Sequence, residues 1–305
     1  MDSSAAAEPL SLAEARELVA AAVSAVVHDL DLRAFLIKGP TSTHHGLRPP
    51  RESVDVDVLV SPSNFAALTD ALRARGWRPY ADDTTAHVIP LHSLTLVHER
   101  WPLELDLHHR FPGFLADPQV VFDALWERRQ TLEQAHQSVF MPDRNSSILI
   151  AALHYERAPE MHASSMNDLR ERATALLSPE DLIDLAELAA QTGCADTLRD
   201  FLDSLGAPPI GVGTSDPAEL AAWNLYRAGG RVTGVAWFEE LRRTPWPGRP
   251  ALLWHAVMFT EDELRFKYPD APAGARGLWL ARYWRIRQAV KAFPEARRVM
   301  RAQRP

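Results

Sequence analysis

Apolar residues in the first part of the chain change repeatedly between helical and strand spacing. At residues 11–29 they recur every three or four positions behind Ser11 and Glu14, which have the spacing of a capping box, so a helix is predicted there. The apolar run 34–37 predicts a strand that ends in a tight turn at 38–40. Similar patterns predict strands at 54–60, 86–89, 94–97 and 103–107, and a helix from about 62 to 76.

After about residue 117 the spacing becomes helical, with few strand signals. Helices are predicted at 119–130, 145–155, 166–177, 179–191 and 196–205, with several more toward the end. The Pro- and Gly-containing stretch 206–217 predicts a loop between an early and a late helical group. The expected fold class is therefore α+β: a small mixed-sheet core at 1–117, then a mostly helical domain at 118–305 with a sub-boundary near 206–217.

Composition, the cysteine count and the first residues of the chain indicate the cellular compartment that we expect. A chain of 305 residues with 46% hydrophobic residues is large and apolar enough for a buried core. Cys194 is the single cysteine, so no intramolecular disulfide is expected, and the first residues lack the basic and then apolar run of a secretion signal. No apolar run approaches the roughly 18–20 residues of a membrane span. We therefore expect a cytoplasmic protein without a membrane span.

Charge is distributed unevenly along the chain. The net charge is −7, but residues 271–305 carry nine Lys or Arg and one Glu, so this segment has a charge of +8 and the remainder −15. The same segment predicts a basic aromatic helix, in which Trp279 and Tyr283 alternate with Arg282, Arg285 and Arg287. Such a helix suits RNA, an acidic partner or a membrane surface. The alternative is that its aromatic side packs on its own domain.

Two aspartates share one face of the strand predicted at 54–60. Its four valines alternate with Asp55 and Asp57, whose Cα atoms are then roughly 6.5 Å apart, at about 3.3 Å per residue. Carboxylates at this spacing converge on one metal ion or on a pair, and hard oxygen ligands select Mg²⁺ or Mn²⁺. The alternative is a sheet face that is simply exposed to water.

A second strand, at 103–107, repeats the acidic pattern with Glu104 and Asp106 on one face. If the two strands are neighbours, Asp106 faces Asp55 or Asp57 at about 5 Å between Cβ atoms. Carboxylates this close repel one another unless cations neutralise them, which favours a metal site. Spacing alone leaves open whether Glu104 or Asp106 is the third ligand.

The order of these motifs resembles that of the uncharacterised nucleotidyltransferase family of the DNA polymerase beta-like superfamily. The resemblance rests on Lys38-Gly39, Arg51, the strand 55–60 and the strand that runs through Asp106 to His108. It covers roughly residues 30–205, with His154 and Asp168 as weaker matches in the helical part. It implies a compact αβ core, two Mg²⁺ (or Mn²⁺) ions, and transfer of a nucleoside monophosphate from a nucleoside triphosphate such as ATP, with release of pyrophosphate.

The resemblance also implies roles for the acidic residues. Asp55 and Asp57 would bind both metal ions. Asp106 would bind the catalytic metal and help deprotonate the acceptor hydroxyl. His108 shares the face of Asp106 and is a candidate to hold that carboxylate by a hydrogen bond.

The same resemblance implies a triphosphate site at the turn after the first strand. Backbone N–H groups at Gly39 would meet the triphosphate, while Lys38 and Arg51 would neutralise its charge. Where many members of the superfamily have Gly-Ser or Gly-Gly, this chain has Gly39-Pro40, and proline has no N–H to donate. The hydroxyl group of Thr41 or Ser42 is the expected replacement. The loop histidines His44 and His45 could reach substrate or metal, or lie in solvent.

The acceptor is open: a small molecule, a peptide or RNA. A toxin-like enzyme that modifies transfer RNA is one version of this hypothesis. A catalytically silent nucleotide-binding or scaffold protein of the same fold is an alternative, motivated by Pro40 and by the large helical half. A glycosyltransferase that binds a sugar nucleotide through Asp-x-Asp and a metal is a third, but it requires neither the Lys-Gly turn nor the second acidic strand.

Overall fold

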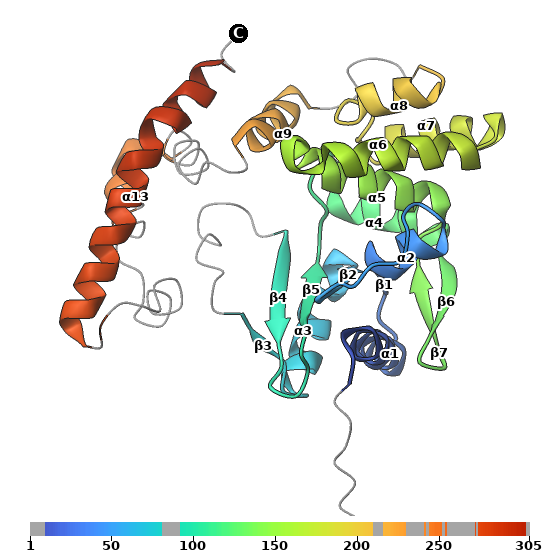
Figure 1. The fold of residues 1–305 in the computed structure, drawn as a ribbon, viewed down its shortest axis with the longest axis horizontal. Coiled ribbons are helices and arrows are strands. Elements are labelled where there is room, and N and C mark those ends of the chain that lie inside the picture. Colours follow the sequence, from blue (N-terminus) through green and yellow to red (C-terminus); the bar gives the residue numbers. More distant parts are fainter. Residues whose placement is uncertain are drawn as a thin grey trace, which may run out of the picture.

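A computed structural model describes residues 10–80, 92–209, 216–229, 241, 244–251, 254, 272 and 274–302. It confirms the α+β class: a five-stranded mixed sheet in the N-terminal half is followed by a helical half (Figure 1). The strand predicted at 86–89 lies outside the described residues. Among the described residues, no helix combines the length and the apolar character of a membrane span.

The sheet has the strand order β1-β2-β5-β4-β3. Strands β2 and β5 pair in parallel, and the other neighbours are antiparallel. The five strands are β1 (Ala34–Ile37), β2 (Asp55–Val60), β3 (Arg78–Pro79), β4 (Ser93–Val97) and β5 (Glu104–His108). The two acidic strands are therefore neighbours, whereas the short edge strand β3 has no counterpart among the predicted elements.

Helix α1 (Leu12–Asp29) covers one face of the sheet, and its start follows from the sequence. The Ser11 side chain accepts a hydrogen bond from the backbone N–H of Glu14, whose carboxylate accepts one from the N–H of Ser11 at 2.8 Å. Apolar residues of α1 and of α3 (Phe65–Arg73) form one core with the valines of β2. Val54 was predicted as the first residue of this strand, but it precedes β2 and is 60% exposed.

Helices α2 (Gly39–His44), α4 (Pro118–Glu127) and α5 (Arg144–Glu156) cover the opposite face. Apolar residues of α4 and α5 form a second core with Phe35, Ile37 and Leu59 of the sheet, and Figure 1 shows α1 and the helical stack on opposite sides of it. The helices that follow are α6 (Pro159–Leu176), α7 (Pro179–Gln191), α8 (Arg199–Leu205), α9 (Pro217–Gly229) and α13 (Ala275–Ala302). This second core crosses residue 117, and the division into domains at that point stays a prediction.

A β-hairpin interrupts the mostly helical half, and neither of its strands was among the predicted elements. Strands β6 (Gln130–Gln134) and β7 (Gln137–Met141) pair in antiparallel fashion. Their connection is Ala135-His136, both with positive φ (46° and 62°), as a tight hairpin turn requires. The helix predicted at 119–130 accordingly ends at Glu127, and the chain turns back beside α1, where the Ser24 hydroxyl donates to the Ser138 carbonyl.

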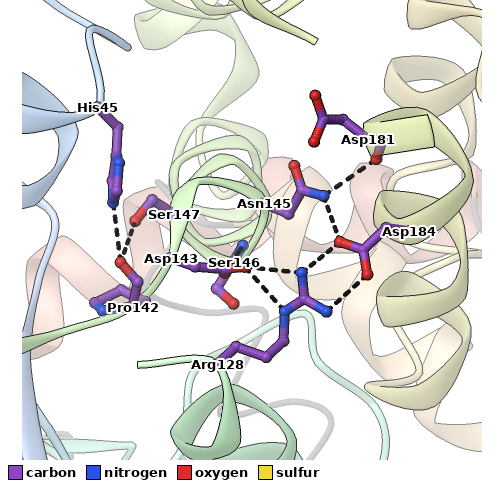
Figure 2. A network of polar contacts seen from close by, with 9 residues as sticks. All are labelled: His45, Arg128, Pro142, Asp143, Asn145, Ser146, Ser147, Asp181 and Asp184. Carbon is purple, nitrogen blue, oxygen red and sulfur yellow. Dashed lines mark hydrogen bonds and ion pairs between the residues drawn. The ribbon is translucent and has the colours of Figure 1, made fainter. Parts of the chain in front are cut away.

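A polar network fixes the hairpin to the helices that follow it (Figure 2). The Arg128 guanidinium donates to Asp143 through Nε and Nη2 at 3.0 and 2.7 Å, and to Asp184 through Nη1 at 2.7 Å. Asn145 Nδ2 donates to the same Asp184 carboxylate at 2.6 Å. The hydrogen bond from Arg128 lowers the pKa of Asp184, and the bonds to both aspartates raise the pKa of Arg128. One arginine thus joins α4, α5 and α7.

Candidate active site

The acidic face of the sheet is assembled by the pairing of β2 with β5. In this parallel register Asp57 lies opposite Asp106, and Asp55 lies opposite Glu104. Because side chains alternate along a strand, all four carboxylates share one face. On the other side of β2, the antiparallel partner of Asp57 is Ile37, so Lys38 follows directly at the end of β1.

Asp57 lies at the centre of this face. Its Oδ1 atom is 2.5 Å from Lys38 Nζ and 2.9 Å from Nε2 of His108. The side chains of Asp57 and Lys38 are 6% and 16% exposed, so this ion pair is largely removed from water. Donor atoms of Asp57, Asp106 and His108 all lie within 4.8 Å of one another. The Thr95 hydroxyl donates to Asp106 at 2.6 Å from the neighbouring strand β4.

The electrostatics of the cluster keep Asp57 ionised. Burial alone would raise the pKa of Asp57, but the Lys38 ammonium and the His108 hydrogen bond hold it well below its ordinary value. Burial lowers the pKa of His108, which favours a neutral ring that donates from Nε2 to Asp57. Burial, together with Asp106 and Asp55, raises the pKa of Glu104. This face thus concentrates negative charge.

The donor set of this cluster fits a divalent cation. Two carboxylates and an imidazole within 4.8 Å offer hard oxygen ligands and one nitrogen, a donor set that can hold a divalent cation. Asp106 rather than Glu104 belongs to this close group, and its role as the third metal ligand stays a prediction. His108 bonds to Asp57 rather than to Asp106, the partner that its position suggested. Asp55, at the start of β2, accepts a hydrogen bond from Ser53.

The turn after β1 is ordered by its own hydrogen bonds. The Lys38 carbonyl accepts from the Thr41 hydroxyl at 2.7 Å and from the Ser42 N–H at 2.9 Å. A hydroxyl has one proton to donate, so that of Thr41 is used within the turn. At Gly39, an added Cβ would meet no other atom within 4 Å. Pro40 falls in the first turn of α2, where a helix needs no N–H.

The predicted loop histidines lie in a different part of the molecule, beside the Arg128 network. His45 is 8% exposed and bonds to the Pro142 carbonyl at 3.0 Å, so it is not a solvent-exposed loop residue. With His44 it lines a polar pocket of about 620 Å³ beside the Arg128 network. Arg51 is exposed in the loop before β2. The pKa of His162 on α6 is lowered mainly by burial and next by the charge of Arg51.

A basic wall formed by His92 and Arg157 lies beside the carboxylates and was not predicted. The ring of His92 lies 5.9 Å from that of His108, and Arg157 Nη2 is 3.3 Å from His92 Nε2. Arg157 also donates through Nε to the Tyr226 hydroxyl at 3.1 Å, which links α5 to α9. The pKa of His154 is lowered to about 3, mainly by burial and next by the charge of Lys38. His154 and Arg157 come 48 and 51 positions after Asp106 in the chain, and no spacing in the sequence signals that His92 and Arg157 lie beside the site.

The fold and this cluster define a nucleotidyltransferase. A mixed sheet presents carboxylates on two parallel neighbouring strands, next to a lysine at a strand-to-helix turn. The chain belongs to the uncharacterised nucleotidyltransferase family, whose model matches residues 12–204. This match confirms the resemblance found in the sequence, and it implies a nucleoside triphosphate as substrate.

Solved structures with related folds have low similarity to the chain. An antigenic nucleotidyltransferase-like protein from Paracoccidioides brasiliensis is 16% identical with a TM-score of 0.39, over 66% of this chain and 95% of that one. A tRNA-processing enzyme in an apo form is 14% identical with a TM-score of 0.30, over 86% and 80%. A tRNA nucleotidyltransferase complexed with a primer tRNA and an incoming ATP analog is 11% identical with a TM-score of 0.29, over 93% and 100%. No curated protein matches the chain.

Proposed function

We propose that the chain transfers a nucleoside monophosphate from a nucleoside triphosphate to an acceptor hydroxyl, with Mg²⁺ or Mn²⁺ bound at the acidic face. The observation that carries the proposal is the register of β2 and β5, which sets Asp57 directly opposite Asp106. When bound, the divalent cations would supply charge neutralisation at the reacting phosphate. Asp57 and Asp106 would hold them, with Asp55 contributing from the exposed start of β2.

In the proposed reaction a bond forms between the acceptor oxygen and the α-phosphorus, and the bond from that phosphorus to the β-phosphate oxygen breaks. The leaving pyrophosphate keeps the electron pair of that bond. Asp106, which Thr95 orients by a hydrogen bond, would help to take the proton of the acceptor hydroxyl. Lys38, Gly39, Ser42 and Arg51 would bind the triphosphate. We favour Ser42 over Thr41 because the Thr41 hydroxyl already donates to the Lys38 carbonyl.

A labelling experiment tests this proposal. Purified protein is incubated with Mg²⁺ or Mn²⁺, α-phosphate-labelled nucleotides and a host extract, beside the variants Asp106→Asn and Asp70→Asn. We expect label on RNA, protein or a small molecule with the wild type and with Asp70→Asn, whose exposed carboxylate lies on α3, but not with Asp106→Asn. The acceptor class is read from the labelled fraction. Nucleotide binding without any labelled product would favour the silent scaffold instead.

The surface of α13 favours RNA among the acceptors. Trp279, Tyr283, Ile286 and Val290 are spaced for one helical face and are 43–65% exposed, whereas Gly277 and Ala281 on the opposite face are buried. The Arg282 guanidinium lies over the Trp279 ring, 5.0 Å from its centroid. Exposed aromatic rings beside arginines bind bases by stacking and phosphates by charge. Figure 1 shows α13 set apart from the sheet and its helical cover.

Charge reversal on α13 tests the RNA interaction. We expect the triple variant Arg282→Glu, Arg285→Glu and Arg287→Glu to weaken transfer-RNA binding at least about tenfold. The slope of log affinity against log salt concentration should fall by the contribution of about three phosphate contacts. Fluorescence anisotropy at several salt concentrations measures both effects. The control places the same charge change on the sheet domain, at the exposed residues Arg73, Arg75 and Arg100. Equal loss in both triple variants would show a general charge effect and contradict a specific surface.

A further inference from the structure

One carboxylate oxygen at the candidate metal site already has two partners. Asp57 Oδ1 accepts from the Lys38 ammonium at 2.5 Å and from His108 at 2.9 Å. A divalent cation held by Asp57 and Asp106 must neutralise the same carboxylate, so the ammonium and the metal ion compete for it. We propose that Lys38 is an internal counter-ion of Asp57, which a divalent cation displaces and which then moves to the triphosphate. This inference rests on the proposed function.

The charge distribution gives the pair its strength. Asp55, Asp57, Glu104 and Asp106 share one face of the sheet, and the ammonium of Lys38 binds the most buried of these carboxylates. With both side chains of the pair at most 16% exposed, water screens their attraction weakly. A divalent cation that binds here without displacing Lys38 would place two positive charges beside the positive charge of the ammonium. Displacement removes this repulsion, and it also leaves the lysine without its anion.

The geometry of the turn restricts the movement to the side chain of Lys38. Its backbone has φ 58° and ψ −134°, a region that few non-glycine residues adopt, and its carbonyl accepts from both Thr41 and Ser42. The backbone is therefore fixed, while the four-carbon stem can reorient. The ammonium already lies 5.6 Å from the centre of the Phe111 ring, which offers a favourable face during the exchange. A compact ammonium suits such an exchange better than a planar guanidinium.

This arrangement couples the two ligands of the site. Without nucleotide, displacement costs Lys38 its ion pair with Asp57, so this pairing weakens cation binding. With a triphosphate bound at the turn, the displaced ammonium gains a new anion and the cost falls. Cation and nucleotide should therefore bind with positive cooperativity, and each should raise the affinity for the other by the same factor. The device would keep Asp57 neutralised until the substrate arrives.

Binding of Mn²⁺, followed by electron paramagnetic resonance of the free ion, tests the proposal on the full chain. Without nucleotide, we expect Lys38→Met to bind Mn²⁺ at least about tenfold more tightly than the wild type, because the competing charge is gone. Lys38→Arg, which keeps the charge, should bind Mn²⁺ like the wild type. With a non-hydrolysable triphosphate present, the advantage of Lys38→Met should disappear, because the ammonium now contributes to nucleotide binding.

Two further measurements separate the outcomes. Circular dichroism checks the fold of each variant, and Lys38→Gln, a neutral side chain that can still donate a hydrogen bond, replaces Lys38→Met if the latter does not fold. Equal or weaker Mn²⁺ binding by a folded neutral variant, with binding by the wild type intact, overturns the counter-ion role alone. Absence of Mn²⁺ binding in the wild type and in the neutral variant overturns the metal site and the proposed function with it.

Discussion

Replacing Asp57 with asparagine is expected to lower nucleotidyl transfer by at least about 1,000-fold, the scale of losing a ligand that neutralises charge in the transition state. Asp57 faces Asp106 across β2 and β5, and its carboxylate also carries the contacts with Lys38 and His108. An amide of the same shape keeps the volume of the side chain but loses its charge. Initial rates with saturating nucleotide and acceptor measure the effect.

The same substitution is expected to destabilise the fold, which the experiment must control. A neutral residue at position 57 leaves the ammonium of Lys38 buried without an anion, at a cost of about 2–4 kcal/mol. Rates are therefore compared at a temperature where circular dichroism shows both proteins folded. Asp70→Asn, in an exposed pair on α3, is the matched control and should keep wild-type rates. A folded Asp57→Asn protein with more than a tenth of the wild-type rate would contradict a catalytic metal site at this residue.

The acidic strands of the site were predictable because two constraints act on them together. One face packs against α1 and is apolar, and the other carries the carboxylates, so acidic and apolar residues alternate from Asp55 to Val58. Leu59 continues the carboxylate face as an apolar residue of the second core. The alternation fixes which face a side chain occupies, but not which strand lies beside it. The parallel register that sets Asp57 against Asp106 depends on long-range packing of β5 between β2 and β4. Chain order alone does not reveal that register.

The hairpin β6-β7 escaped prediction for a local reason. Its turn, Ala135-His136, adopts positive φ at both residues without the glycine or asparagine that normally signals such a turn. Its strands are polar on their exposed side, and only Val139 and Met141 are buried apolar residues of β7. Packing against α1 and β1 therefore overrides weak local preferences. A stretch of this composition also fits a helix end or a loop, and the pattern predicted a helix up to residue 130.

The basic wall of the site escaped prediction because it is purely tertiary. His92 and Arg157 lie 65 residues apart and meet only when α5 packs over the sheet. Neither has a charge pattern or spacing that distinguishes it from the other polar residues around it. The position of His108, by contrast, followed from the strand, and only its partner was wrong: the ring reaches across to Asp57 on β2.

Replacing Arg128 with methionine is expected to destabilise the protein by about 2–3 kcal/mol. The guanidinium binds both Asp143 and Asp184, so its loss leaves two carboxylates close together without a cation (Figure 2). The side chains of Arg128, Asp143 and Asp184 are 30%, 16% and 38% exposed, and partial screening by water keeps the effect below that of a fully buried pair. Methionine retains most of the packing volume, so the loss reflects charge and hydrogen bonds.

The midpoint of urea unfolding measures this effect, with the slope checked against the wild type. Arg73→Met removes an exposed ion pair with Asp70, whose side chains are 49% and 77% exposed, and should change stability by less than about 0.5 kcal/mol. Adding Asp184→Asn to Arg128→Met should restore part of the stability, because it removes one of the two uncompensated charges. An unchanged midpoint for Arg128→Met would mean that packing of α4, α5 and α7, rather than this network, holds the hairpin and the helical half together.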